Sequence, residues 1–132
     1  MIGVDSNVLV RFLIGDDKRQ TELARAFLAQ RTADDPAFVS ALVVAEVVWG
    51  LDKVYDVPRE NIHEMLALVI GSANVHVERE PLVAEALRLA RAKNADIADS
   101  LIAALARDAG CSATMTFDKP AAKRIPGMEL LA

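Results

Sequence analysis

The sequence has one cysteine and no long apolar run. The single thiol, Cys111, cannot form a disulfide within the chain, and it lacks the paired spacing of a zinc or redox site. We therefore expect Cys111 to be a small core residue. The least polar stretches, PAFVSALVVA and LALVIGSANVHV, are shorter than the roughly 20 apolar residues of a membrane span. No segment is expected to cross a bilayer.

Basic residues are also in the minority. The chain has 15 Lys and Arg against 19 Asp and Glu, a formal net charge of -4, which argues against a nucleic-acid-binding protein held by a broad basic surface. Strand-like residues begin at Ile2 and leave no room for a leader segment, so we expect a cytoplasmic location. Repeats, low-complexity segments and linkers are absent. The 132 residues are predicted to form a single domain, residues 1–132.

Five short segments are apolar or β-branched and alternate with helix-like stretches. They predict five strands: IGVD, AFVS, NVHV, ATMTF and MELL. Two intervening segments carry apolar residues at helical spacing and predict core-facing helices. These residues are Leu23, Ala24, Phe27 and Leu28, then Ile62, Met65, Leu66, Val69 and Ile70. Strands that alternate with helices imply a parallel sheet covered on both faces. We predict an α/β fold, a three-layer α/β/α sandwich with a five-stranded, mostly parallel sheet.

Four acidic residues are predicted to share one edge of this sheet. Ligands of open α/β sheets bind outside the carboxyl ends of the strands. Asp5 ends the first strand and Asp118 ends the fourth. A helix that precedes a parallel strand begins at the same edge, which places Asp99 in a first helical turn. Glu46 lies early in the helix after AFVS, so we expect all four acids to converge.

Each acid also has an ordinary structural explanation. Asp5 could cap a helix and Asp118 could be a turn residue. Asp99, with Asp96 as a cap, could complement a helix dipole. Glu46 interrupts the apolar stretch ALVVAEVVWGL, where an unpaired buried carboxylate is costly, unless its side chain reaches the surface at an edge. The four together are improbable as a coincidence.

A cluster of four carboxylates requires a counter-charge. Two carboxylates about 5 Å apart repel by roughly 3 kcal/mol at an effective dielectric near 20, so protons or divalent cations must neutralise the cluster. An all-oxygen set favours Mg²⁺ or Mn²⁺ over zinc. We do not expect ligands in His63, on a polar helix face, or in His76, on a remote strand. Metals held by carboxylates promote in-line phosphoryl transfer, which predicts hydrolysis of a phosphodiester.

Four ordered motifs resemble those of the PIN-domain ribonucleases, and in particular the VapC-type toxins of bacterial and archaeal toxin-antitoxin pairs. VDSNVLVRFL resembles the opening motif of the family, VSALVVAEVVWGL the second, ADIADSLIAALA the third and TMTFDKPAAKRIPGMELL the closing one. The resemblance covers the whole chain. It implies an endoribonuclease that depends on Mg²⁺ or Mn²⁺.

The resemblance implies roles for individual residues. The catalytic acids would be Asp5, Glu46, Asp99 and Asp118. Of these, Asp5, Asp99 and Asp118 would bind the metal, while Glu46 would orient metal or water. Supporting positions would be Asp96, Ser6, Asn7, Ser40 and Thr116. Two positions depart from the family pattern, because Ser6 stands where Thr is usual and Ile97 where an aromatic is frequent, but neither change removes a ligand.

The family also implies partners. These are structured RNA such as transfer or ribosomal RNA, a small cognate antitoxin, and a second copy of the chain in a homodimer. The segment VVWGLDKVY is a candidate dimer face, although we expect Trp49 in it to pack in the core. The chain is neutral apart from the four site acids, so its acidic balance does not exclude RNA. Phosphate contacts are predicted for Arg11 and Lys119, and also for Lys123 and Arg124, unless these are ordinary solvated charges.

Two other functions fit parts of the pattern. A haloacid-dehalogenase-type phosphatase also begins with a strand that ends in Asp, but it needs a second Asp two positions on, where this chain has Asn7. A non-catalytic PIN-like module that binds RNA or a protein partner would have the same fold. Such a module has no reason to keep four mutually repelling carboxylates.

Overall fold

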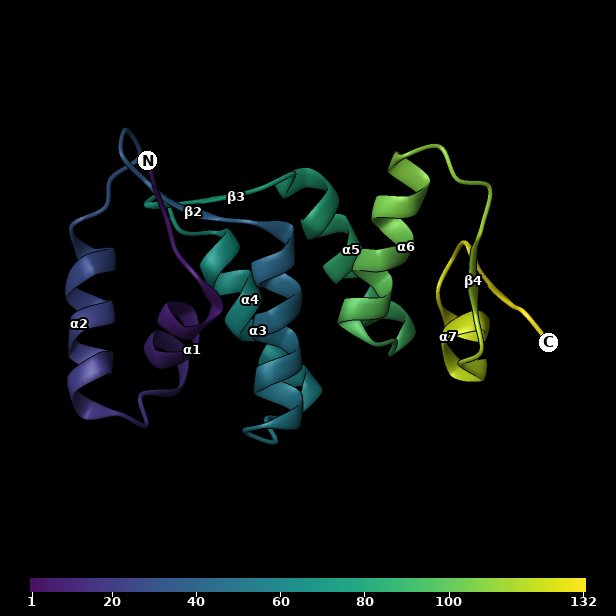
Figure 1. Cartoon of the computed structure of the whole chain (residues 1–132), viewed down its shortest axis with the longest axis horizontal. Helices are drawn as coiled ribbons and strands as arrows, with labels where there is room; N and C mark the ends of the chain where they lie inside the picture. The colour runs from purple at the N-terminus through teal and green to yellow at the C-terminus, as the bar shows by residue number, and fades with distance from the viewer. The chain divides into compact units, whose positions relative to one another are not determined.

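The computed structural model describes residues 1–132 and contains seven helices and five strands (Figure 1). The chain divides into two compact units, Met1–Glu80 and Pro81–Ala132, which are described separately below. None of the helices combines the length and apolar character that a membrane span requires. The single domain expected from the chain length stays a prediction.

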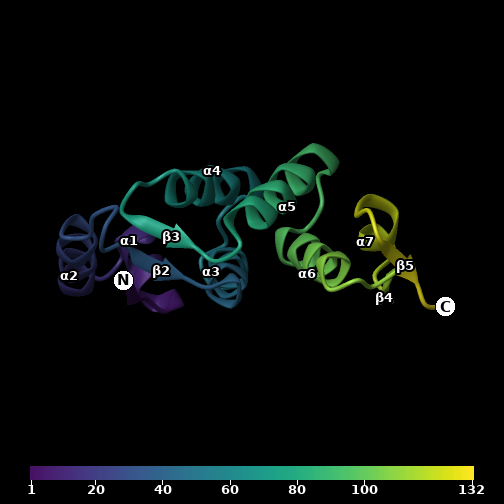
Figure 2. The same ribbon diagram turned by 90° about the horizontal axis from the view of Figure 1, so that it is seen from above.

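The first unit contains a three-stranded parallel ladder and four helices. Its strands are β1 (Ile2–Gly3), β2 (Ala37–Val39) and β3 (Val75–Val77), paired in the order β1-β2-β3. Figure 2 shows β2 and β3 side by side. The helices are α1 (Ser6–Ile14), α2 (Lys18–Ala29), α3 (Ala41–Lys53) and α4 (Arg59–Ile70). Each of the first two strands leads into a helix within two residues, and the last residue of the connection, Asp5 or Ser40, is the N-cap of that helix.

Apolar side chains on one face of each helix form the core of the first unit. Helix α3 buries Val44, Val47, Val48 and Leu51, and it packs against both α1 and α4. Helix α4 buries Ile62, Leu66 and Val69 as predicted. Its His63 is also buried, with 3% of its surface exposed. The prediction that His63 lies on a polar helix face is therefore wrong, because the buried face of α4 includes His63 beside Ile62. Leu23 of α2 is exposed, so only part of the stripe predicted there faces the core.

The second unit contains a two-stranded parallel ladder and three helices. The strands are β4 (Thr114–Thr116) and β5 (Met128–Leu130). The helices are α5 (Glu80–Lys93), which starts at the last residue of the first unit, α6 (Ile97–Asp108) and α7 (Lys119–Arg124). One buried cluster in this unit consists of Ala95, Ala103, Ala121, Ile125 and Met128. This cluster fixes the starts of α6 and α7, where the predicted acids lie.

The fold class predicted from the sequence is confirmed. The structure is α/β with parallel strands, all five predicted strands are present, and a three-layer arrangement is consistent with it. The strands pair as three plus two, whereas a five-stranded sheet was expected. Each strand has only two or three residues, so each ladder rests on few hydrogen bonds. The prediction that Cys111 is a core residue is wrong: Cys111 is exposed, because it follows Gly110 in the connection from α6 to β4.

Candidate functional site

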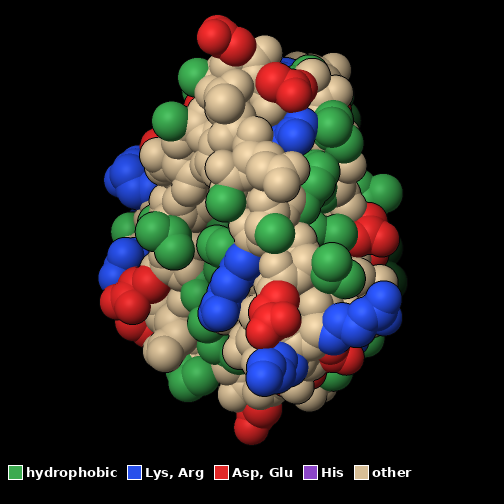
Figure 3. Space-filling model, turned by 90° about the vertical axis from the view of Figure 1, so that its left-hand side faces the viewer, with side chains coloured by type: hydrophobic (Ala, Val, Ile, Leu, Met, Phe, Trp, Pro, Cys, Tyr) green, Lys and Arg blue, Asp and Glu red, His purple; other side chains and the backbone are tan.

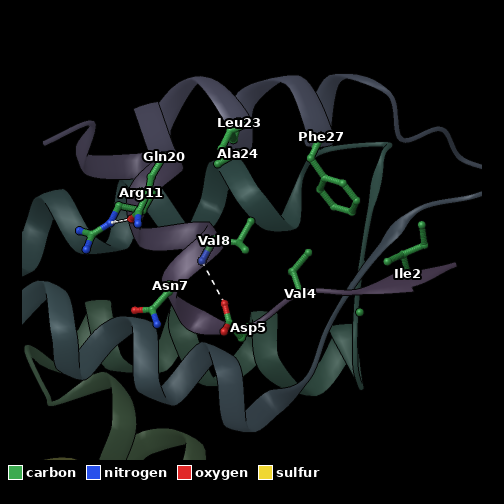
Figure 4. A pocket seen from close by; sticks show the side chains of 11 residues that line it. Ile2, Val4, Asp5, Asn7, Val8, Arg11, Gln20, Leu23, Ala24 and Phe27 are labelled. Atoms are coloured by element: carbon green, nitrogen blue, oxygen red, sulfur yellow. Dashed lines mark hydrogen bonds between the residues drawn. The ribbon is translucent and has the colours of Figure 1, made fainter. Parts of the chain in front are cut away.

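Asp5 ends the predicted segment IGVD, two residues after the last residue of β1, Gly3. It is the N-cap residue of α1, and its Oδ1 accepts a hydrogen bond from the Val8 backbone N–H at 3.1 Å (Figure 4). A carboxylate has about four acceptor positions, so the cap uses only part of its capacity. The ordinary explanation for Asp5 is thus correct, and it leaves acceptor capacity for a ligand.

Glu46 is held by a contact from another helix. It lies in the second turn of α3, its side chain is exposed, and its Oε2 accepts a hydrogen bond of 3.1 Å from the Ser6 hydroxyl. Ser6 is the first residue of α1 and follows Asp5 in the chain. The packing of α1 on α3 therefore brings Asp5, Ser6 and Glu46 to one place in the first unit, and exposure removes the cost that a buried Glu46 would carry.

The N-terminus of α3 has two further polar contacts. Ser40 is its N-cap residue, with Oγ accepting from the Val43 N–H at 3.1 Å. Glu78, which follows β3, accepts from the Ala41 N–H through Oε1 at 2.9 Å. Glu78 was not among the predicted residues, although an acid at the carboxyl end of a parallel strand is the feature that selects Asp5 as well. Ser40 and Glu78 hold the helix that carries Glu46.

In the second unit, aspartates gather at the starts of α6 and α7. Asp96 is the N-cap of α6, and its Oδ1 accepts from the Asp99 N–H at 2.9 Å. Asp118 is the N-cap of α7, and its Oδ1 accepts from the Ala121 N–H at 2.9 Å. Two hydroxyls support this arrangement. The Thr116 Oγ1 accepts from the Asp118 N–H at 3.0 Å, and the buried Ser100 hydroxyl donates to the Asp96 carbonyl at 2.9 Å.

Asp99 lies close to two other aspartates. It is half-buried in the first turn of α6. Burial raises the pKa of its carboxyl group, and the negative charges of Asp96 and Asp118 raise that pKa further. All three influences disfavour the ionised form, so a nearby cation would stabilise this group of carboxylates.

The donor set of the two groups fits a hard divalent cation. Every predicted ligand is a carboxylate oxygen, which suits Mg²⁺ or Mn²⁺, and the crowding at Asp99 is relieved by positive charge. Neither unit by itself brings together three or more His, Cys, Asp or Glu side chains in an arrangement that could hold a metal ion. The convergence of all four acids that the sequence predicts therefore stays a prediction.

The predicted phosphate-binding residues differ in their surroundings. The Arg11 guanidinium donates to Gln20 Oε1 at 2.6 Å and to the Tyr55 hydroxyl at 2.7 Å, and it pairs with Asp16 at 3.1 Å. Figure 4 shows the contact with Gln20. Arg11 thus links α1 to α2 and to the end of α3. Lys119 is exposed at the first position of α7. Figure 3 shows basic and acidic side chains interspersed on one face, in keeping with a surface of mixed charge.

Two hollows border Asp5, Ser6 and Glu46. One, of about 700 Å³, runs along β1, α1 and α2 and has Asp5 and Asn7 in its lining (Figure 4). The other, of about 280 Å³, is lined by residues that include Ser6, Asn7, Glu46 and Trp49. The predicted core position of Trp49 is wrong, because 60% of its surface is exposed. Trp49 lies three residues after Glu46 and therefore shares its exposed helix face.

Comparison with known proteins identifies the family of the chain. The family model described as PIN domain matches residues 2–126, a range that contains all four predicted catalytic acids. The chain is also 25% identical over 116 residues to the VapC ribonuclease of Aquifex aeolicus (strain VF5), and the match covers 88% of this chain and 86% of that protein. The predicted family is confirmed: the chain belongs to the PIN-domain family.

Proposed function

We propose that this chain is an endoribonuclease that depends on Mg²⁺ or Mn²⁺ and acts as the toxin of a toxin-antitoxin pair. Its PIN-domain membership and its similarity to a VapC ribonuclease support this function. The observation that carries the proposal is the environment of Asp99, where burial and two neighbouring carboxylates raise the pKa. A carboxyl group whose pKa is raised by burial and by neighbouring charges is typical of a functional site, and a bound cation would relieve the repulsion at Asp99.

In this proposal the four acids of the PIN-like motifs act together on one cation. Asp5, Asp99 and Asp118 hold the cation, and Glu46 orients it or the attacking water. When bound, the cation activates water and neutralises charge on the scissile phosphate. Water adds to phosphorus and the bond to the 3′ oxygen breaks, which leaves a 5′-phosphate and a 3′-hydroxyl. We propose that the four acids share one cation because the chain carries, in order, the four motifs that resemble those of the PIN domain.

Polar neighbours fix the acids before any RNA binds. The Ser6 hydroxyl holds one Glu46 oxygen, and Thr116 holds the backbone that leads into Asp118. Asp96 fixes the first turn of α6 by accepting from the Asp99 N–H. Pre-orientation of this kind raises the affinity of carboxylates for a metal. We propose that Ser6, Asp96 and Thr116 are positioning residues for this reason, and that Asn7 and Ser40 assist from the starts of α1 and α3.

An RNA cleavage assay tests the catalytic proposal. The purified chain is incubated with total RNA under three conditions, with Mg²⁺, with Mn²⁺ and with a chelator. We expect cleavage with either ion and none with the chelator or in an Asp5→Asn variant. Asp17→Asn is the matched control, because Asp17 caps α2 in the same way, through the Gln20 N–H, and lies outside the proposed site. RNA binding without cleavage at any metal concentration would instead favour a non-catalytic module.

The biological part of the proposal has its own tests. We propose a cytoplasmic toxin that forms a homodimer, cuts structured RNA and is neutralised by a small antitoxin. Expression of the chain should arrest growth, and co-expression of a short adjoining reading frame should relieve the arrest. Light scattering on the purified chain should give twice the mass of one copy, 14.3 kDa. Harmless expression would contradict the toxin role without affecting the cleavage assay.

A further inference from the structure

The hollow beside Glu46 has a lining unlike that of a phosphate site. Helix α1 contributes Ser6, Asn7 and Val10, helix α3 contributes Glu46, Trp49 and Gly50, and the segment after α3 contributes Val54 and Tyr55. None of these eight residues is Lys or Arg, and one is an acid. A phosphate is repelled by such a lining, whereas a neutral aromatic group is not.

Trp49 supplies a stacking surface in this hollow. Its side chain is 60% exposed, and Val54, which also lines the hollow, is 64% exposed. Exposed apolar side chains that lie together and are rimmed by polar groups mark interaction sites, whereas single exposed ones need no explanation. Unpaired bases of RNA bind proteins by stacking on aromatic side chains, and indole has the largest aromatic face among the side chains.

The polar groups of the lining suit the edge of a base. The Asn7 amide offers both a donor and an acceptor, and the hydroxyls of Ser6 and Tyr55 lie in the same lining. Tyr55 is held in place because its hydroxyl accepts a hydrogen bond from Arg11 at 2.7 Å. One aromatic face together with a few fixed polar groups is the pattern of base recognition in single-stranded RNA.

We propose that this hollow is a base-binding subsite, in which an unpaired nucleobase of the RNA stacks on Trp49 next to the phosphodiester that is cut. The inference rests on the proposed function in taking RNA as the substrate. It adds that the substrate presents an unpaired base beside Glu46. The segment VVWGLDKVY, considered above as a dimer face, then faces RNA through Trp49 and Tyr55.

Trp49 gives a direct signal for this test, because it is the only tryptophan of the chain. The chain is titrated in EDTA with a single-stranded oligoadenylate, and the tryptophan emission is recorded. We expect saturable quenching by this RNA and little quenching by inorganic polyphosphate or by a blunt RNA duplex, since neither offers an unpaired base. Unchanged emission, or equal quenching by polyphosphate, would overturn the proposal.

Gly50 allows the hollow to be filled without loss of the fold. A Cβ added at Gly50 meets no atom within 4 Å, and Gly50 lies inside helix α3, where leucine is a better helix former than glycine. Gly50→Leu should therefore melt at a temperature no lower than the parent chain. We expect it to weaken binding of a dye-labelled oligoadenylate by about 10-fold, since a stacked base contributes roughly 5- to 150-fold.

Three companion variants separate stacking from a structural role. Trp49→Ala should weaken binding as much as Gly50→Leu, and Trp49→Phe should restore most of it because a ring remains. Leu42→Ala is the matched control, since Leu42 is an apolar residue of the same helix, is 69% exposed and lies outside the hollow. Equal weakening by Leu42→Ala, or no weakening by Gly50→Leu, would overturn the proposal.

The same experiments distinguish failure of this inference from failure of the proposed nuclease function. Binding is measured without metal, so quenching with no cleavage in Mg²⁺ or Mn²⁺ would sustain the subsite and reject the nuclease. Cleavage in Mg²⁺ or Mn²⁺ with a KM for RNA that is unchanged in Gly50→Leu would sustain the nuclease and reject the subsite. If Trp49 emission instead shifts on dilution of the chain alone, the hollow is a contact between two copies and the proposal is overturned.

Discussion

The two units of this chain hold their acidic side chains in different ways. In the first unit, Glu46 is exposed and accepts a hydrogen bond from Ser6, and Asp5 accepts one from the start of α1. In the second unit, Asp99 is half-buried, and burial together with Asp96 and Asp118 raises its pKa. The first unit therefore orients carboxylates with donors, while the second unit crowds them together.

This difference separates the two requirements of a cation site. Oriented acceptors determine where the ion binds, and crowded charges determine how much its binding is favoured over the empty state. In the first unit, orientation and stability do not conflict, because the donors also satisfy the carboxylates. In the second unit they do conflict, since the repulsion that favours the ion also lowers the stability of the folded chain without it.

The largest effect is expected from Asp99→Asn. The variant loses a proposed ligand, so cleavage of RNA should fall by more than about 100-fold, a larger effect than loss of an orienting neighbour. Its free energy of unfolding without metal should rise, by no more than about 1 kcal/mol because solvent screens a half-exposed group. Cleavage rates and denaturant titrations in EDTA measure the two effects.

The pH dependence of stability tests why Asp99→Asn should raise the free energy of unfolding. A raised pKa means that folded Asp99 binds its proton more tightly than unfolded Asp99 does. The free energy of unfolding therefore falls as pH rises from the ordinary carboxyl pKa through the raised value, and the full benefit exists only below the ordinary value. Asp99→Asn should lack this fall. If both chains lose stability in parallel over this interval, crowding does not characterise the second unit.

A smaller effect is expected from Ser6→Ala in the first unit. The variant removes the hydroxyl that donates to Glu46 Oε2, so cleavage should fall by about 10- to 100-fold. Stability should change little, because Glu46 is exposed and water replaces the lost donor. Ser6→Thr keeps the hydroxyl and should retain most of the activity. Cleavage rates measured over a series of Mg²⁺ concentrations test this, and a large loss of stability in Ser6→Ala would contradict the comparison.

Much of the fold follows from short-range signals in the sequence. All five strands lie within the predicted segments, and Asp96 caps α6, as the structural explanation of the Asp96 and Asp99 pair predicted. Caps and short β-branched strands depend on residues within one or two turns, so the sequence alone predicts them. The aspartates at Asp5 and Asp118 are caps as well, which shows that a structural and a proposed catalytic role coexist in the same residue.

Contacts between distant segments were harder to predict. The bond from Ser6 to Glu46 joins residues 40 positions apart and depends on how α1 packs on α3. Trp49 and Leu23 lie on apolar stretches, yet both are exposed. Periodicity identifies an apolar face, but it does not tell whether another element covers that face. Glu78 is different, because it lies outside the four family-like motifs although it directly follows the parallel strand β3.

The smallest effects are expected at Asp17, and they separate capping from catalysis. Asp17→Ala removes the cap of α2 and should lower the free energy of unfolding by about 1 kcal/mol, while metal-dependent cleavage at saturating RNA stays unchanged. Asp17→Asn keeps an acceptor and should match the parent chain in both measurements. Asp5→Asn also keeps its cap but should lose cleavage. Both aspartates cap helices of the same unit, and each accepts a hydrogen bond from the backbone N–H of the third helical residue. Only the proposed metal site therefore distinguishes the two positions. Equal cleavage activity of the two Asn variants would show that the carboxylate of Asp5 is a cap alone.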